Sequence, residues 1–200
     1  VSSVIEHPAT AQPCQWLAHQ GYALALLDVD GDGCVRGAQA AQLLDANTAL
    51  LTVMHSNNET GVLQPIAELA SLAHVVGALV HTDAAQSVGK VAIDVAALGV
   101  DALSVAGHKL YAPKGVGALY VKRGSRFRPL LRGGHQERGR RAGTENAAGF
   151  VGLGMACELA EVHMPMMSHL AELRDELQAG LLAKVPCSIV TGDSENRTPN

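Results

Sequence analysis

The sequence predicts an α/β fold with a mostly parallel sheet and helices on both of its faces. Apolar runs of about four to eight residues, rich in Val, Leu and Ala, recur along the chain between Gly, Asp, Asn or Pro residues. Helical patterns separate several of these runs. Because the runs are continuously apolar and not alternating, we expect strands covered on both faces, as in a parallel sheet with crossover helices.

The predicted elements follow one another in a regular order. Strands are expected at residues 1–5, 23–29, 49–55, 79–82, 102–105 and 117–121, and helices at residues 10–20, 37–45 and 65–76. Pro65 suits the first turn of its helix because its missing N–H would have no partner there anyway. The arginine-rich stretch at residues 123–141 is expected to be a long loop, and loops of this length are commonly functional.

The C-terminal part predicts a second, smaller unit. We expect a helix from Thr144 to about residue 162, a break at 164–167, another helix to about residue 184 and a strand at 186–191. Residues 1–163 then form part of a large domain, and residues 164–200 begin a small one. Strand patterns at both termini predict a fragment that is incomplete at both ends.

Composition excludes several classes of protein. The 200 residues are 48% hydrophobic and 17% charged, which supports a sizeable core and excludes a disordered chain. A net charge of −4 argues against a nucleic-acid-binding module. The sequence contains no apolar stretch of about 18 residues, so it predicts no membrane span. The four cysteines are scattered, which predicts free thiols and a reducing, cytoplasmic setting.

Metal and nucleotide motifs are incomplete. Asp28, Asp30 and Asp32 resemble the start of a calcium loop, but the twelfth position holds Gln39 in place of the required Glu, so an acidic turn is the better interpretation. His81 and Asp83 share one face of a strand, but no second close pair supports a metal site. Neither a dinucleotide-binding glycine motif nor a Walker A motif is present. We therefore expect no metal.

Polar residues instead gather at the ends of predicted strands, where α/β proteins place their sites. A lone aspartate there is usually a cap, and a lone lysine usually lies on the surface. Together, a lysine amine, a carboxylate, imidazoles and amides are what pyridoxal phosphate (PLP) requires. The candidates are His7, Asn58, Asp83, Gln86, His108 and Lys109.

Three motifs carry a family resemblance: HTDAAQSVGK from His81, GHKLYAPKGVGALY from Gly107, and RAGTEN from Arg141. In this order and spacing they resemble the cysteine desulfurases, which are PLP enzymes of fold type I in the class V aminotransferase superfamily. Selenocysteine lyases are close relatives. The resemblance runs from His7 to about residue 160 and implies the large domain of that fold.

The resemblance also implies roles for individual residues. Lys109 matches the lysine that binds PLP covalently and moves protons, and Asp83 matches the carboxylate that pairs with the pyridine nitrogen. His7 matches the histidine that stacks on the ring and takes part in proton transfer. Asn58 and Gln86 match the residues that hydrogen-bond the phenolic oxygen, and His108 matches a residue that binds the phosphate. Thr144 matches a threonine that reaches the phosphate of the partner subunit's cofactor.

The implied function is removal of sulfur from L-cysteine, which yields alanine and a persulfide, within sulfur metabolism and iron–sulfur cluster assembly. A homodimer and sulfur-acceptor proteins are the implied partners, with no nucleic acid and no membrane. Two alternatives stay open. One is a selenocysteine lyase, and the other is a non-catalytic remnant or scaffold that binds no cofactor.

Three departures from the family pattern limit the resemblance. Ala106 stands where many members have a phosphate-binding serine, and we do not assign that role to Ser104. Cys157 and Cys187 match no position of the family's sulfur-accepting cysteine, so both are expected to be structural. The family's glycine- and threonine-bearing phosphate loop precedes His7 and has no counterpart here. The 200 residues alone are therefore expected to be inactive.

Overall fold

The computed structural model describes all 200 residues, and its strands form two adjoining sheets. The strands are β1 (Ser2–Ser3), β2 (Leu26–Leu27), β3 (Leu50–Thr52), β4 (Leu79–Asp83), β5 (Ala102–Ala106) and β6 (Gly117–Val121). β1 pairs with β2, and β3, β4, β5 and β6 pair in that order. The Val1 ammonium donates to the Leu50 carbonyl at 2.8 Å, which joins β1 to the edge of β3.

The pairing confirms the prediction of a mostly parallel sheet. β1–β2, β3–β4 and β4–β5 are parallel, and only β5–β6 is antiparallel. The first three strands are shorter than the expected 1–5, 23–29 and 49–55. β1 ends because the chain turns at Val4 and Ile5, and β2 is short because it pairs only with the two residues of β1.

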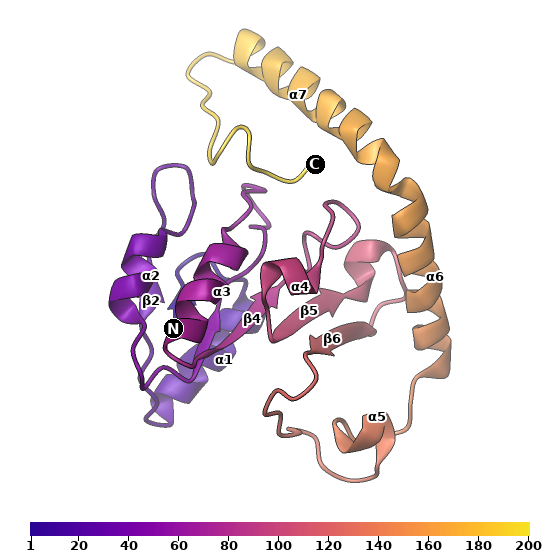
Figure 1. The fold of residues 1–200 in the computed structure, drawn as a ribbon. Coiled ribbons are helices and arrows are strands. Elements are labelled where there is room, and N and C mark those ends of the chain that lie inside the picture. The colour runs from indigo at the N-terminus through magenta and orange to yellow at the C-terminus, as the bar shows by residue number, and fades with distance from the viewer.

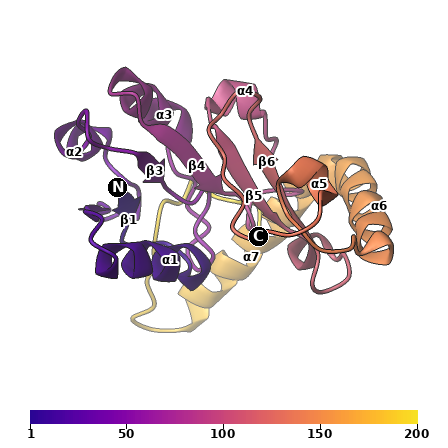
Figure 2. The same ribbon diagram turned by 90° about the horizontal axis from the view of Figure 1, so that it is seen from below.

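Helices lie on both sides of this sheet, as predicted (Figure 2). They are α1 (Pro8–His19), α2 (Gly37–Leu43), α3 (Ile66–Val75), α4 (Val95–Leu98), α5 (Gln136–Gly139), α6 (Ala147–His163) and α7 (Met167–Lys184), with 3-10 turns η1 (Gly107–Leu110) and η2 (Met164–Met166). Figure 2 shows α2, α3 and α4 on one side and α1 on the other. No helix combines the length and the apolar character that crossing a lipid bilayer requires.

The core lies between α3 and the sheet. α3 buries Ile66, Leu69, Ala70 and Ala73, which recur at the three- and four-residue spacing of one helical face. This face packs on buried residues of the parallel strands, such as Leu51, Val80 and Leu103. α1 buries no residue, so the opposite side of the sheet is covered less tightly.

Two predictions about local structure are wrong. The helix expected from Thr144 begins at Ala147, because the side chain of Asn146 caps it by accepting a hydrogen bond from the Gly149 N–H at 3.0 Å. The strand expected at residues 186–191 is absent. A turn with a φ of 61° at Cys187 interrupts the apolar run, and Ile189 is 82% exposed with no strand beside it.

Two short helices were not anticipated. α4 is a single turn whose first amides, those of Ala96 and Ala97, donate to the Asp94 carboxylate. α5 lies inside the stretch expected to be a loop, and its positive φ angles at Glu137 and Arg138 show that it is irregular. The remainder of that stretch is the predicted loop.

The break expected at 164–167 is a 3-10 turn within a continuous helical path. Figure 1 shows α6 leading into α7, which arches above the strands with the end of the chain between them, and η2 joins the two helices. Met164 keeps helical dihedral angles of −50° and −40°, and Pro165 lies in the first turn of η2, where it needs no donor. The domain boundary at this point stays a prediction.

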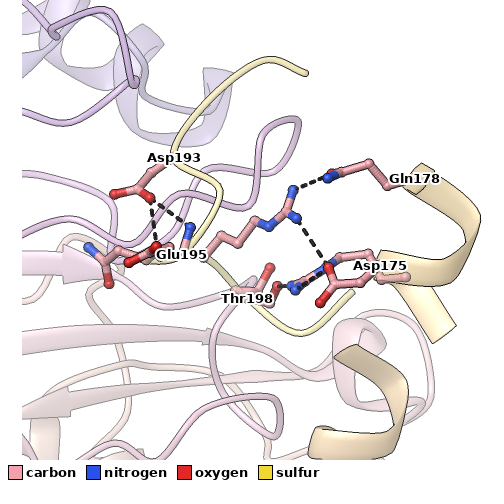
Figure 3. Close-up of polar contacts among 8 residues, drawn as sticks. Asp175, Gln178, Asp193, Glu195 and Thr198 are labelled. Atoms are coloured by element: carbon pink, nitrogen blue, oxygen red, sulfur yellow. Dashed lines mark hydrogen bonds and ion pairs between the residues drawn. The ribbon is translucent and has the colours of Figure 1, made fainter. Parts of the chain in front are cut away.

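The C-terminal segment ties α7 back to the sheet domain. The Arg197 guanidinium donates to Gln178 Oε1 at 2.9 Å and to Asp175 Oδ1 at 3.2 Å, both on α7 (Figure 3). The Thr198 N–H donates to the Gly61 carbonyl at 2.9 Å, and Arg197 forms a backbone bridge with Val62. The turn that contains Gly61 is therefore held from outside by the end of the chain.

We predict that Leu69→Ala destabilises the protein by about 2–5 kcal/mol, because its side chain is 1% exposed in the core and truncation leaves a cavity. Leu177→Ala on α7 is the matched control. That side chain is 65% exposed, so the expected change is within about 0.5 kcal/mol. Urea unfolding of both variants measures the difference, and equal losses would contradict the placement of the core.

Candidate active site

A cavity of about 310 Å³ opens where the parallel strands end. Its walls come from the segments that follow β1, β3, β4 and β5, because parallel strands deliver their carboxyl ends to the same edge of a sheet. The lining residues include His7, Thr10, Met54, Ser56, Asn58, Asp83, Gln86, Ser104, Ala106, His108 and Lys109.

Asp83 is the last residue of β4, and the strand's alternation directs its side chain into the cavity. The preceding Thr82 points the other way, is fully buried and donates to the Val53 carbonyl at 2.7 Å. One Asp83 oxygen, Oδ1, accepts the Ala85 N–H at 2.9 Å. The second oxygen has no partner within the protein, so it is available to a bound group.

His108 and Lys109 lie on η1, the tight turn after β5. A Cβ on Gly107 would stand 2.6 Å from the Val116 carbonyl oxygen, so this close approach requires glycine. Leu110 anchors the turn by packing with Ala112 and with Ala156 of α6. Neither His108 nor Lys109 forms a hydrogen bond or ion pair with another side chain, which leaves both free for a ligand.

His7 caps α1 through its ring. Its Nδ1 accepts the Ala9 N–H at 3.1 Å, and Pro8 follows at the first helical position. A nitrogen that accepts a hydrogen bond carries no proton, so the neutral ring has its proton on Nε2. The cap therefore makes His7 a hydrogen-bond donor through Nε2.

Two amides complete the polar lining. Asn58 follows β3 in a turn that Asn57 stabilises, because Asn57 Oδ1 accepts the N–H groups of Glu59 and Thr60. Gln86 Oε1 accepts from Lys90 Nζ at 3.1 Å, which leaves the Gln86 amide nitrogen free to donate. Burial lowers the pKa of Lys90, and the nearby charge of Lys109 lowers it further.

The structure brings six of the seven predicted site residues to this cavity and leaves Thr144 outside it. Thr144 is exposed in the segment between the arginine-rich loop and α6. Asn146 is the cap of that helix, so Thr144 does not cap it.

A hydrogen-bonded row that the sequence motifs did not predict lies beneath the cavity. His81 Nδ1 lies 2.7 Å from Thr52 Oγ1, and His81 Nε2 lies 2.9 Å from Ser104 Oγ. Burial lowers the pKa of His81, and the charge of Asp83 partly opposes that shift. The alternation of His81 and Asp83 was the available signal. Ser104 lines the cavity, but its hydroxyl is engaged with His81.

The carboxylates and imidazoles do not assemble into a metal-binding group. Asp30 Oδ1 accepts the N–H groups of Asp32 and Cys34, both at 3.0 Å, so the acidic segment forms a turn. A hydrogen-bonded turn agrees with the sequence-based interpretation of this segment.

The donor set of the cavity fits the ring end of PLP. The lysine without a partner matches the aldehyde, and the half-satisfied carboxylate matches the pyridine nitrogen. The His7 imidazole matches the ring face, and the two amides match the phenolic oxygen. The phosphate end is less complete, because Ala106 lines the wall without a polar side chain.

Comparison with known proteins gives one consistent match. The model of the family "Aminotransferase class-V" matches residues 1–200. Cysteine desulfurases of Enterobacter agglomerans and Klebsiella pneumoniae are 52% and 54% identical over 200 and 199 residues, and each alignment covers 100% of this chain and 50% of the relative. The cysteine desulfurase NifS of Azotobacter vinelandii is 53% identical over 204 residues. The chain thus spans about half the length of the curated relatives it matches.

Solved structures agree with these relatives. A NifS-like protein superposes with a TM-score of 0.94 at 36% identity, over 100% of this chain and 55% of the other. SspA, solved in complex with cysteine, superposes with a TM-score of 0.80 at 38% identity, over 89% of this chain and 51% of the other. These likenesses confirm the α/β fold that the sequence predicts.

The partly buried His81 predicts how the stability of the protein depends on pH. The folded protein holds His81 with a lowered pKa, so the unfolded state binds more protons below about pH 6.5, and stability falls as the pH drops from 7 to 5. His81→Gln should lower the melting temperature at pH 7 but reduce this acid loss. Thermal unfolding from pH 5 to 8 measures both effects, with His19→Gln at the end of α1 as the control. A pH-independent gap between His81→Gln and the unmodified protein would contradict the assignment.

Proposed function

The chain belongs to the class V aminotransferase family, and from that premise we propose that the protein is a PLP-dependent cysteine desulfurase. The observation that carries the proposal is the convergence of Lys109, Asp83 and His7 on one cavity. The relatives at 52% and 54% identity, both named cysteine desulfurase, support the reaction.

The residues that would hold the cofactor are those of the cavity wall. Lys109 supplies the amine that reacts with the aldehyde, and Asp83 supplies its free oxygen to the pyridine nitrogen. His7 packs on the ring, while Asn58 and Gln86 donate hydrogen bonds to the phenolic oxygen. When bound, PLP supplies a cationic ring that takes up negative charge from the substrate.

The protein's own groups then move the protons. Lys109 would take the proton from the substrate α-carbon and return it when alanine forms, while the electron pair of the broken carbon–sulfur bond stays on the β-carbon, which takes up a proton. His7 offers the proton on Nε2, because its Nδ1 stays hydrogen-bonded to the Ala9 N–H at the start of α1. A thiolate accepts the sulfur as a persulfide, and alanine leaves.

The persulfide carrier is not assigned to a cysteine of this chain. Cys157 lies exposed on α6 and Cys187 in the turn after α7, and neither lines the cavity. We keep the expectation that both are structural. The four unpaired cysteines support the proposed reducing, cytoplasmic setting.

For assembly we propose a homodimer in which Thr144 reaches the phosphate of the partner's cofactor. The exposed position of Thr144 next to a loop rich in arginine supports this, since arginine and backbone N–H groups bind phosphate. A two-fold dimer is also the commonest symmetric assembly. Sulfur-acceptor proteins are the further partners we propose.

The activity is tested in full-length protein by measuring alanine release from L-cysteine and from selenocysteine. Lys109→Ala should lower the rate by about 10²–10⁴-fold or more, because general acid–base catalysis alone contributes that much. Lys114→Ala, an exposed lysine outside the cavity, is the matched control and should keep the rate.

A preference for selenocysteine would replace the proposal with a selenocysteine lyase. Full-length protein that binds PLP but releases alanine from neither substrate would overturn both activities. Failure to bind PLP at all would favour the non-catalytic scaffold.

Thr144→Ala tests the dimer. In full-length protein this change should weaken PLP retention, measured by visible absorbance after dialysis, while circular dichroism shows an unchanged fold. PLP retention is measured in parallel for Thr10→Ala, which changes the cavity wall of the same subunit. Unchanged retention in Thr144→Ala, or a monomer in sedimentation that retains PLP normally, would contradict the proposed dimer site.

A further inference from the structure

Glu6 is a buried acid that the proposed mechanism does not use. It lies between β1 and α1, immediately before His7, and is 9% exposed. Its Oε1 accepts two hydrogen bonds, from Ser3 Oγ at 2.5 Å and from the Met54 N–H at 2.9 Å. Its Oε2 is buried without a hydrogen-bond partner, and no lysine, arginine or histidine forms an ion pair with it.

These bonds join two walls of the cavity. Met54 follows β3 and lines the cavity, whereas Glu6 belongs to the turn that carries His7. A second bond runs in parallel, since Asn57 Nδ2 donates to the Ile5 carbonyl at 3.3 Å. The backbone just before His7 is thus fixed to the end of β3 at two successive residues. The one hydrogen bond of the His7 side chain goes to the first turn of α1, from the Ala9 N–H, so it does not tie His7 to β3.

The surroundings of Glu6 favour the uncharged acid. A buried carboxylate without a counter-charge is costly, and protonation removes that charge. Burial raises the pKa of Glu6 to about 7; the bonds from Ser3 and Met54 oppose the shift, and the charge of Asp83 adds to it. Asp83 on β4 is the charged group that acts on Glu6, while β1 and the end of β3 present neutral donors.

We propose that Glu6 is a positioning residue that, as an uncharged acid, fixes His7 against the cofactor cavity. The inference rests on the proposed function for the role of His7, but the geometry it describes exists in the protein without PLP. Ionisation of Glu6 would place a second negative charge beside Asp83 in a buried site without a counter-charge. The bond from the Met54 N–H would persist, because a carboxylate is a stronger acceptor than the neutral acid.

Three variants separate this role from a merely structural one. Glu6→Gln keeps an uncharged side chain of the same shape that can accept from Ser3 and Met54. Glu6→Ala removes both bonds and leaves the Met54 N–H buried without a partner. Glu161→Gln, an exposed glutamate on α6, is the matched control for the loss of a carboxylate.

The first readout is amide NMR on the protein without PLP. The Met54 amide shift should titrate with a midpoint near pH 7 in the unmodified protein and in Glu161→Gln, and should stay flat in Glu6→Gln. The Ala9 amide, which donates to His7 Nδ1, should keep its hydrogen-bonded shift in Glu6→Gln and lose it in Glu6→Ala. An Ala9 amide that is identical in all variants would overturn the proposal.

The second readout is PLP affinity by absorbance titration near neutral pH. Glu6→Ala should weaken binding by roughly tenfold, the cost expected for a buried donor left unpaired, and Glu6→Gln by less than about twofold. Equal weakening in both would overturn the proposal, because it would make the charge itself the contributor. If no variant binds PLP but the Ala9 amide still responds as described, the proposed function fails and the positioning role stands.

Thermal unfolding supplies a readout even if Glu6→Ala does not fold. A folded-state pKa above the unfolded value of 4.5 means that stability is lost as the pH rises from 4.5 to about 7. The melting temperature of Glu6→Gln relative to the unmodified protein should therefore increase over that range. Taking the difference cancels the opposite effect of His81. A constant difference would show that folding does not raise the pKa of Glu6, which would overturn its role as an uncharged acid.

Discussion

The parallel register of β3, β4 and β5 is the constraint on which the rest of the structure depends. It aligns Thr52 with His81 and Asp83 with Ser104 across neighbouring strands, so the row beneath the cavity and the carboxylate above it are fixed together. It also delivers the segments after all three strands to one edge of the sheet. The cavity is a consequence of that register, and the α3 core on one face stabilises it.

Around the cavity, several polar side chains are held by hydrogen bonds within the protein, while groups that a ligand could use are left free. His81 uses both ring nitrogens, Thr82 donates to the neighbouring strand and Asn57 holds its own turn. By contrast, one oxygen of Asp83 and the amine of Lys109 have no partner within the protein. A site built in this way is arranged in advance of ligand binding, so little ordering remains when a cofactor enters. The segment at residues 193–198, which holds the turn before Val62, extends this support to α7 (Figure 3).

The sequence predicted the sheet and most of the cavity because both follow from local patterns. The apolar runs that end at Asp83 and before Gly107 indicate where β4 and β5 end and in which direction their side chains point. Other features depend on contacts between distant segments. The apolar run at 186–191 is a strand only where a neighbouring strand pairs with it, and Glu6 looks like an ordinary turn residue until Met54 is brought to it. The cap at Asn146 in place of Thr144 was equally ambiguous, since both residue types accept the required hydrogen bond.

Reductive labelling of the lysines tests whether Lys109 is the reactive amine of this cavity. The protein is incubated with PLP, treated with borohydride, and mapped by peptide mass spectrometry over its five lysines: Lys90, Lys109, Lys114, Lys122 and Lys184. If the carboxyl ends of the parallel strands form the ring end of a PLP site, the label should fall on Lys109 well before the other four, and Asp83→Asn should reduce that preference. Even labelling of exposed lysines, or preferential labelling of any other lysine, would contradict the account.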